Sequence, residues 1–534
     1  MERRLAGLPA STGLAFGPAV AFRAIGATAR AQGSVAEERQ ALADAVASAL
    51  AAVLTLAASL EGEAADIVGF QAALLDDDAL TEGAYAAIEQ GAPAETAWRQ
   101  AMAEEIAGYD TSDDAYFRAR SADLIDVRDR VLRCLFGLPE PTQTPVGSVI
   151  VGEDLPPSAF LGIDWSKGGG IVLGAGSPSS HVAMLARGRG VPMVVGIGPD
   201  WQALSGTVVV DGAAGIVLTA PTPDSVAQAR LRADEFGRMR TRSEARMTEP
   251  ALTLDGTRIA VMINLAALAD VAGFPVEACD GIGLTRTEFL VERALHDEAR
   301  QYELYAQLLR WAAGRSVTIR TLDAGGDKPI AGYTIAGESN PFLGLRGVRL
   351  SLRHPDVFRV QLRALARAAA LGALKIMLPM VTAPQELEQA RALLDEVVEE
   401  LSAEGADCAR PALGIMVEVP AAAMAVERFD AAFFSIGSND LTQYATAASR
   451  DGSEVAGHAD VLHPGVLAMI GHVARHGAAS GLEVSLCGDA GGDPRSIAAL
   501  LRAGVRTLSV SPGLVAQTRA TIREIDLSSP EPEA

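Results

Sequence analysis

The stretch LGIMVEVPAAAMAVERFDAAFFSIGSND, residues 413–440, contains two apolar segments separated by an alanine-rich helical segment. The two apolar segments, Leu413–Val417 and Ala432–Ile436, are predicted to be strands. Each is followed within a few residues by acidic or amide side chains. Two strands joined by a helix form a parallel βαβ unit. The stretch therefore predicts a parallel sheet with polar residues at the carboxyl ends of its strands.

The same alternation of strand and helix continues over residues 251–534. The other predicted strands are Arg258–Asn264, Gly281–Leu284, Ser316–Thr321, Leu374–Leu378, Glu483–Leu486 and Thr507–Val510. Eight strands alternating with helices over about 280 residues are typical of a (β/α)8 barrel. The predicted fold of this part is therefore a C-terminal TIM barrel.

Charged residues gather where the predicted barrel strands end. Catalytic groups of such barrels lie at the C-terminal ends of the strands, so these residues are expected to share one rim. The residues at the strand ends and in the loops after them are Arg286, Glu288, Arg320, Asp323, Arg346, Glu418, Asn439, Asp440, Arg450 and Cys487.

The residue types at this rim indicate a substrate. Several arginines suit a ligand with a phosphate and a carboxylate, because guanidinium donates in a bidentate way to both. Two carboxylates from different strands suit a hard cation such as Mg²⁺. Ordinary ion pairs at the rim are the alternative for any single arginine. A lone cysteine such as Cys487 is most often a small buried apolar residue, although at this position a thiol could give a proton to an enolate.

The first 250 residues have a different pattern. Residues 34–137 show helical spacing of apolar residues and predict an antiparallel bundle of about four helices. Strand-like segments on both sides of this block indicate a small α/β domain into which the bundle is inserted. Residues 221–250 predict a charged linker helix whose Pro- and Thr-rich ends are hinges.

A glycine-rich loop brings a histidine to the start of a predicted helix. The loop is GAGSPSSH, residues 174–181, and the helical pattern follows His181. The N-terminus of a helix favours a bound anion, so a phosphoryl group on His181 would be stabilised there. Ser180 could hydrogen-bond one ring nitrogen and leave the other as the nucleophile. A packing or capping role is the alternative for such a histidine.

Composition narrows the class of protein. The 534 residues carry a net charge of −22, which argues against nucleic acid as a ligand. The four cysteines have no CxxC spacing, so neither a zinc site nor a disulfide framework is indicated. The uncharged stretch Ala45–Leu60 is too short and too weakly apolar for a membrane span, so it is interpreted as the buried face of a helix. A cytoplasmic enzyme is expected.

Nine segments together resemble Enzyme I of the bacterial phosphoenolpyruvate-dependent phosphotransferase system, over nearly the whole chain. They are AGLPASTGLAFG (6–17), GSPSSHVAMLARGRGVPMVVG (176–196), GIGLTRTEFL (281–290), TIRTLDAGGDK (318–328), NPFLGLRGVRL (340–350), KIMLPMV (375–381), VEVPAA (417–422), FFSIGSNDLTQY (433–444) and CGDAGGD (487–493). The departures are mild: Ser180 replaces a usual threonine, and Asp489 stands where glutamate is common.

The resemblance implies a role for each matching residue. His181 would be the phosphorylated nucleophile, and Cys487 would protonate the enolate of pyruvate. Glu418 and Asp440 would hold Mg²⁺. The residues implied to bind phosphoenolpyruvate are Arg286, Arg320, Arg346, Asn439, Asp440 and Arg450.

The resemblance also implies domains and partners. Residues 1–33 and 138–220 would form the phosphohistidine domain, and residues 34–137 the docking domain for HPr, a small histidine-phosphorylated carrier. Residues 221–250 would be the linker, and residues 251–534 the phosphoenolpyruvate-binding barrel that makes a homodimer. The implied activity is phosphoenolpyruvate–protein phosphotransferase, the first step of sugar uptake by this system, without insertion into a membrane.

Three alternatives remain open. A nitrogen-regulatory form of the enzyme usually carries an extra N-terminal sensory domain, and the opening motif at residue 6 favours the sugar-type form. Pyruvate,phosphate dikinase or phosphoenolpyruvate synthase would need a long nucleotide-binding domain, for which residues 34–137 are too few. A catalytically dead phosphocarrier or scaffold is disfavoured by the retained reacting groups.

Overall fold

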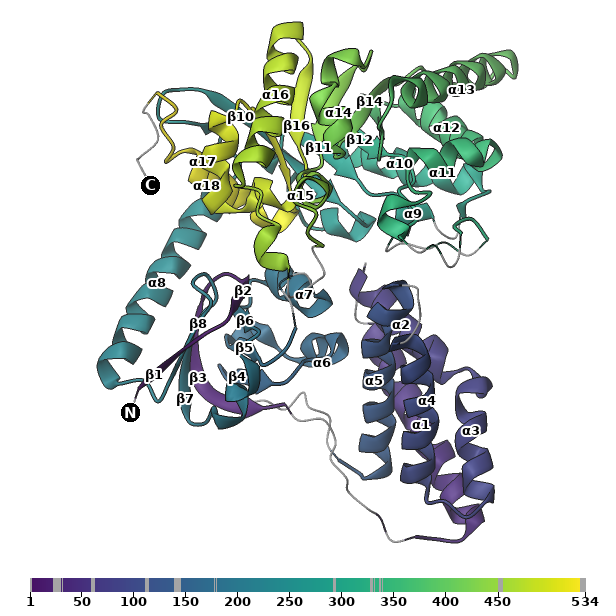
Figure 1. Ribbon diagram of the computed structural model, residues 1–534, viewed down its shortest axis with the longest axis vertical. Coiled ribbons are helices and arrows are strands. Elements are labelled where there is room, and N and C mark those ends of the chain that lie inside the picture. The colour runs from purple at the N-terminus through teal and green to yellow at the C-terminus, as the bar shows by residue number, and fades with distance from the viewer. Residues whose placement is uncertain are drawn as a thin grey trace. The chain divides into compact units, whose positions relative to one another are not determined.

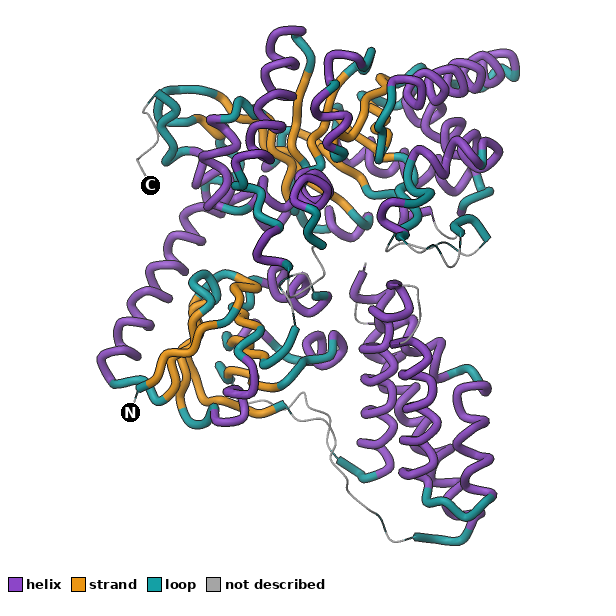
Figure 2. The backbone as a smooth tube through the Cα atoms, viewed as in Figure 1, coloured by secondary structure: helices purple, strands orange, loops and turns teal. Residues whose placement is uncertain are grey.

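The computed structural model divides into two compact units, Met1–Arg238 and Met239–Ala534 (Figures 1 and 2). The residues that the structure describes are 2–22, 30, 32–58, 63–110, 115–138, 146–176, 178, 180–291, 294–326, 330, 332–335, 338, 340–449 and 455–528.

The second unit is a closed parallel barrel, as predicted. Each of the eight predicted strands is present, and the pairing of β11 with β10 closes the ring. A short strand, β9 (Ala251–Leu252), adds to β10 in the antiparallel direction. The barrel strands are β10 (Arg258–Leu265), β11 (Gly281–Thr285), β12 (Ser316–Arg320), β13 (Leu374–Leu378), β14 (Ala412–Val417), β15 (Phe433–Ile436), β16 (Glu483–Leu486) and β17 (Thr507–Val510).

Helices surround the barrel strands (Figure 2). In α12 the residues Val357, Phe358, Leu362 and Leu365 recur at helical spacing and are buried, so this face packs against the strands. The helices of this unit are α9 (Glu288–Val291), α10 (Glu298–Ala312), α11 (Val348–Arg353), α12 (Pro355–Ala369), α13 (Pro384–Ala403), α14 (Pro420–Met424), α15 (Ser438–Thr446), α16 (Pro464–Ser480), α17 (Pro494–Arg502) and α18 (Val515–Ile522).

The first unit contains a mixed sheet of eight strands in the order β1-β8-β7-β3-β4-β5-β6-β2. Strands β3 and β4 pair in parallel, although the whole helical segment lies between them in the chain. The helical segment is therefore an insertion between two neighbouring strands of this sheet. The strands are β1 (Arg3–Ala6), β2 (Leu8–Ser11), β3 (Leu14–Ala21), β4 (Val149–Gly152), β5 (Gly170–Leu173), β6 (Met193–Val195), β7 (Thr207–Asp211) and β8 (Ile216–Thr219).

The inserted segment has five helices in its described residues, one more than the sequence pattern predicts. One break between these helices falls at Asp76 and Asp77, where the Asp77 side chain accepts from the Ala79 N–H and starts a new helix. An aspartate in this role favours a helix start over helix continuation. The five helices are α1 (Val35–Ala58), α2 (Glu63–Leu75), α3 (Asp78–Glu89), α4 (Ala94–Asp110) and α5 (Ala115–Leu135).

Helix α1 carries most of the uncharged stretch noted in the sequence. One face of α1 is buried in the core of the bundle, where it packs against α2, α4 and α5. This face carries Leu42, Ala45, Ala49 and Val53. By length and composition alone, α1 is also the one helix of the described chain that could cross a membrane. The remaining helices of the unit are α6 (Pro157–Gly162), α7 (His181–Arg189) and α8 (Pro223–Ala245), the last of which contains the division at residue 238.

Candidate active site

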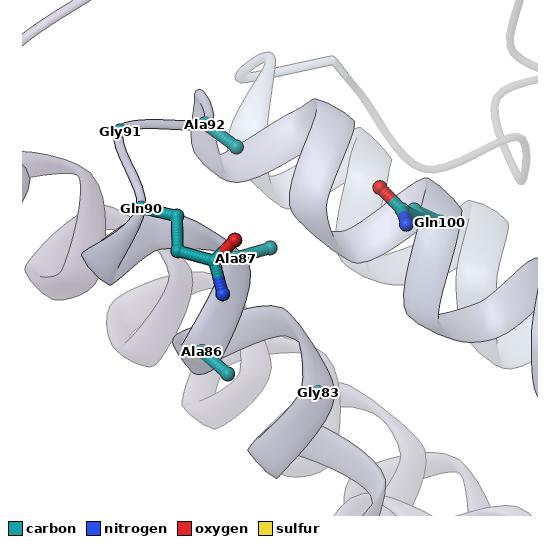
Figure 3. Close-up of a pocket in the computed structure, with 7 residues that line it drawn as sticks. All are labelled: Gly83, Ala86, Ala87, Gln90, Gly91, Ala92 and Gln100. Atoms are coloured by element: carbon teal, nitrogen blue, oxygen red, sulfur yellow. The ribbon is translucent and has the colours of Figure 1, made fainter.

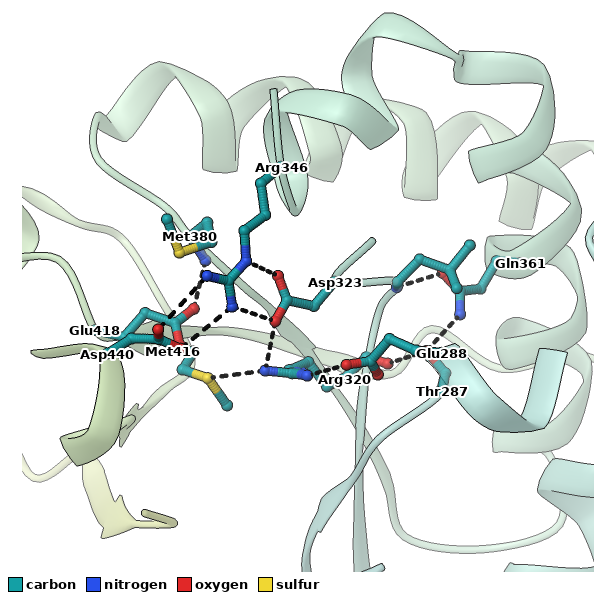
Figure 4. Close-up of polar contacts among 11 residues, drawn as sticks. Thr287, Glu288, Arg320, Asp323, Arg346, Gln361, Met380, Met416, Glu418 and Asp440 are labelled. Carbon is teal, nitrogen blue, oxygen red and sulfur yellow. Dashed lines mark hydrogen bonds and ion pairs between the residues drawn. The ribbon is translucent and has the colours of Figure 1, made fainter. Parts of the chain in front are cut away.

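The C-terminal rim of the barrel holds a buried cluster of alternating charges, shown in Figure 4. Arg346, in the loop before α11, is 1% exposed, and Asp323, after β12, is fully buried. The Nε and Nη2 atoms of Arg346 lie 2.9 Å from the two carboxylate oxygens of Asp323. Such a bidentate pair is strong and geometrically specific. The pair therefore holds the guanidinium of Arg346 in one orientation.

Asp440, on the first turn of α15, is the second partner of Arg346. Its oxygens lie 3.3 and 3.5 Å from Arg346 Nη2 and Nη1, which is longer than the contacts to Asp323. Burial alone would lower the pKa of Arg346, but Asp323 and Asp440 raise it well above its ordinary value. Asp323 is therefore the tight partner, and Asp440 is held more loosely.

Arg320, the last residue of β12, is also buried between acids. Its guanidinium pairs with Glu288 and, at 3.0 Å, with Asp323. Its Nη1 also donates to the sulfur of Met416 at 3.6 Å. Asp323 thus joins two arginines that come from different segments of the rim. Burial of paired charges of this kind is costly unless every partner is in place, so the cluster is a strongly determined feature of the fold.

Glu418 completes the cluster at the end of β14. It is 1% exposed, and Glu418 Oε1 accepts from the Met380 N–H at 2.6 Å. Burial and the nearby carboxylates of Asp440 and Asp323 raise the pKa of Glu418 to about 8, although Arg320 and Arg346 act in the opposite direction. With a pKa of about 8, Glu418 is mostly protonated at neutral pH, so in this arrangement it lies largely neutral beside Asp440.

Two backbone positions bring these segments close together. Met380 has a φ of 58°, which is uncommon for a residue with a side chain, and its N–H points to Glu418. Gly347 has a φ of 61°, and a Cβ there would lie 2.8 Å from Met380 Cβ. Unusual backbone conformations cluster at functional sites, where the surrounding structure holds them.

A chain of buried hydrogen bonds next to the cluster fixes the position of the backbone at the ends of β11 and β12. Gln361 of α12 accepts from the Leu322 N–H at 3.1 Å and donates to Thr287 Oγ1 at 3.3 Å. The Thr287 hydroxyl donates to the Arg320 carbonyl at 2.9 Å. All of these groups are buried, so they hold the chain at Glu288 and Arg320 in a fixed position at the rim (Figure 4).

Cys487 follows β16 and is 3% exposed. Its thiol donates to the Ile436 carbonyl at 3.6 Å. Burial is the largest cause that raises the pKa of this thiol, to about 11, while the Ser435 hydroxyl, Arg320 and Arg286 act to lower it. The group is therefore a protonated thiol at neutral pH, which is the state needed of a proton donor.

The other predicted rim residues are distributed as follows. Arg286 is half-buried directly after β11, and its N–H donates to the Leu265 carbonyl. Asn439 is held by Asp489: its amide donates to the Asp489 carboxylate at 3.1 Å, and its oxygen accepts from the Asp489 N–H at 3.0 Å. Arg450 lies outside the described residues.

The predicted nucleophile lies in the other unit. Helix α7 begins at His181, and the hydroxyl oxygen of Ser180 accepts from the Ala183 N–H as the helix cap. Arg187 donates to the carbonyl of Pro178 at 2.6 Å and so holds the preceding loop. The side chain of His181 lies outside what the structure describes. The cap leaves the Ser180 hydroxyl hydrogen available, so its predicted bond to the imidazole stays a prediction.

The cluster offers cationic groups for an anionic substrate and two acids for a cation. In the part of the chain that is described, no group of three or more His, Cys, Asp or Glu residues is arranged to hold a metal ion. The pair Glu418 and Asp440 would therefore leave most coordination positions of a cation to other ligands, as Mg²⁺ sites in phosphate enzymes do.

Sequence reasoning gave no role to several residues that the structure places in the site. Glu288 and Asp323 were visible as acids at strand ends, but their pairing with the arginines was not. Met380 and Gln361 carry no sequence signal for their roles, because backbone strain and a buried amide contact depend on the tertiary fold.

A separate hollow lies between α3 and α4, with a volume of about 500 Å³ (Figure 3). Its lining consists of small residues and two amides, and no lining side chain is ionisable. The lining residues are Gly83, Ala86, Ala87, Gln90, Gly91, Ala92 and Gln100. This composition does not fit a catalytic site.

Comparisons with known proteins assign the chain to a family. Three family models match the chain: the N-terminal domain of PEP-utilising enzymes over residues 6–120, their mobile domain over 144–215, and their PEP-binding domain over 240–527. The last of these covers the whole barrel and every rim residue named above.

Curated relatives match over most of the chain. A phosphoenolpyruvate-protein phosphotransferase of Geobacillus stearothermophilus is 34% identical over 98% of this chain and 93% of its own length. One from Haloferax volcanii is 39% identical over 85% of this chain and 80% of its own length. The multiphosphoryl transfer protein of Rhodobacter capsulatus is 38% identical over 84% of this chain, which spans about half of that longer relative (55%). The chain therefore belongs to the PEP-utilising enzymes, in the family of the phosphoenolpyruvate-protein phosphotransferases.

Proposed function

We propose that the chain is a phosphoenolpyruvate–protein phosphotransferase that moves the phosphoryl group of phosphoenolpyruvate to His181 and releases pyruvate. The observation that supports this most directly is the buried rim cluster in which Asp323 joins Arg320 and Arg346 beside Glu418 and Asp440. Arginines in a buried site bind a phosphate and a carboxylate together, and phosphoenolpyruvate carries both.

Different rim residues would bind different groups of the substrate. Arg320 and Arg346 are already fixed by acids, so they present preorganised positive charge to the phosphoryl group. Arg286 and Arg450 follow other segments of the rim and would bind the remaining anionic oxygens. Asn439, whose amide is oriented by Asp489, would donate to the substrate.

A divalent cation, taken to be Mg²⁺, would be held by Glu418 and Asp440. Both groups are buried carboxyls, and burial together with the charge of Asp440 raises the pKa of Glu418; a bound cation would favour the ionised carboxylate and so offset this cost. When bound, the cation neutralises charge on the transferring phosphoryl group. Because Asp440 contacts Arg346 through longer bonds than Asp323 does, it can exchange this partner while Asp323 keeps the arginine in place.

The two halves of the reaction use different units of the chain. Phosphoenolpyruvate would bind to the barrel, and His181 would attack phosphorus nearly in line. His181 belongs to the unit Met1–Arg238, so the units must approach one another for transfer and separate afterwards. After the transfer, the inserted helices would dock an HPr-like carrier, which takes the phosphoryl group. The barrel would form a homodimer. The enzyme would act in the cytoplasm, in the first step of sugar uptake.

The first half-reaction can be tested directly. The full chain is mixed with phosphoenolpyruvate labelled in its phosphoryl group, with and without Mg²⁺. We expect one acid-labile phosphoryl group per chain, an equal amount of pyruvate, and a requirement for the cation. A chain that stays unlabelled and forms no pyruvate would overturn the proposal and favour a dead phosphocarrier or scaffold.

Replacing Cys487 with alanine should slow pyruvate formation by about 10²–10⁴-fold, the usual contribution of a general acid. Because burial raises the pKa of the thiol to about 11, the wild-type donor stays protonated at about pH 6–9 and is lost only as the pH approaches that value. Quenched assays of pyruvate over this pH range measure both effects. Cys408→Ala, at a half-buried cysteine near α13, is the matched control. Wild-type pyruvate formation in the Cys487 variant would exclude this role.

A further inference from the structure

Every donor of the Arg346 guanidinium has a partner in the structure. A guanidinium has five N–H groups, and Arg346 donates five hydrogen bonds to neighbouring side chains. Asp323 accepts two of them at 2.9 Å, Asp440 accepts two at 3.3 and 3.5 Å, and Tyr444 accepts one at 3.4 Å. A phosphoryl group can therefore bind Arg346 only when one of these partners is displaced.

Asp440 is the partner that can leave. Its two contacts with Arg346 are longer than those of Asp323, and the proposed function gives it a second role as a ligand of the cation. The oxygens of Asp440 lie against Nη1 and Nη2, two nitrogen atoms that can bind a phosphoryl group in a bidentate way. Movement of Asp440 to a cation would therefore expose this edge of the guanidinium to the substrate.

Tyr444 is held in place independently of Asp440. It lies on α15, one helical turn after Asp440, and is half-buried. Its hydroxyl accepts from Arg346 Nη1 and donates to the Phe342 carbonyl at 2.6 Å. Because this bond to the backbone fixes the hydroxyl, Tyr444 does not have to follow the Asp440 side chain when that side chain moves.

The same hydroxyl fixes the segment that carries Arg346. Phe342 lies four residues before Arg346 in the chain, and its ring centroid is 5.8 Å from the guanidinium carbon. Tyr444 therefore contacts both the guanidinium of Arg346 and the backbone segment that leads to it.

We propose that Tyr444 is a positioning residue that holds Arg346 Nη1 while Asp440 exchanges this arginine for the cation, an inference that rests on the proposed function. Without the hydroxyl, Asp440 is the one partner of Nη1 among the described residues. Release of Asp440 then leaves a buried nitrogen without a partner, which is costly. The Tyr444 hydroxyl lowers this cost and so favours binding of the cation.

Binding of Mn²⁺ tests this role without turnover. Carboxylate oxygens suit Mn²⁺ as they suit Mg²⁺, and the free ion is measured by electron paramagnetic resonance as it is added to the full chain without phosphoenolpyruvate. In Tyr444→Phe, we expect the affinity for Mn²⁺ to fall about tenfold, the scale of leaving one buried donor unpaired. Tyr302→Phe is the matched control. It removes the hydroxyl of another half-buried tyrosine, whose ring lies against Arg367 on the barrel surface, and should keep the wild-type affinity.

A double-mutant cycle separates an action through Arg346 from a packing effect. In the Asp323→Leu/Arg346→Met background the guanidinium is absent, so adding Tyr444→Phe should no longer change the affinity for Mn²⁺. A loss that comes from altered packing, or from the missing bond to the Phe342 carbonyl, would persist in this background.

Two results would overturn the inference: a wild-type affinity for Mn²⁺ in Tyr444→Phe, or an equal loss of affinity with and without the guanidinium of Arg346. A wild-type chain that binds no Mn²⁺ would instead contradict the cation site of the proposed function, and the inference with it.

Discussion

Replacing His181 with alanine should abolish transfer of the phosphoryl group from phosphoenolpyruvate to the chain. The expected loss is about 10⁴-fold or more, the scale seen when a covalent nucleophile is removed. The physical basis is the placement of His181 at the start of α7, where the backbone N–H groups stabilise an attached anion. Incorporation of labelled phosphate into the intact chain measures the effect.

The same variant should leave the barrel unchanged. The rim cluster belongs to the unit Met239–Ala534, so binding of phosphoenolpyruvate, measured by calorimetry, should keep its wild-type affinity. His472→Gln is the matched control, because His472 is another of the seven histidines of the chain, is half-buried, and lies 3.6 Å from the Glu427 carboxylate rather than at the rim cluster. Acid-labile phosphate that persists in His181→Ala would place the nucleophile at another residue, which peptide mapping would then identify.

Replacing Asp323 with asparagine should damage both stability and catalysis. Asp323 is fully buried and pairs with Arg320 and Arg346, so its loss leaves two guanidinium groups facing each other with one counter-charge fewer. Breaking a buried charge pair by removing one partner costs about 3–5 kcal/mol. Loss of preorganised charge at the substrate should lower the rate of pyruvate formation by about 10²–10³-fold. Urea unfolding and the rate of labelling measure the two effects.

A second variant separates the two losses. Asp323→Leu combined with Arg346→Met removes both charges, so it should recover part of the stability while remaining inactive. Arg359→Met, which removes the pairing with Glu396 and Glu400 on the barrel surface, should change the unfolding free energy by no more than about 1 kcal/mol. A double variant with wild-type labelling would show that this cluster does not bind the substrate.

The barrel was predictable because its pattern is local. Each apolar strand from Arg258 to Val510 is short, is separated from the next by helical or loop residues, and ends in polar residues at a position that the fold class turns into a common rim. The rim membership of Arg320, Glu418, Asp440 and Cys487 follows from this alone. The number of helices in the insertion was predicted only approximately, because a break such as the one at Asp77 depends on one capping side chain rather than on a change of periodicity.

The sequence by itself determined the order of the strands, the residues that reach the rim and the family to which the chain belongs, because these depend on spacing along the chain. Only the tertiary structure decided which groups are partners: Asp323 pairs with two arginines, and the Met380 N–H donates to Glu418. These contacts join residues on different strands and loops. Their geometry depends on how the barrel closes, which no local pattern encodes.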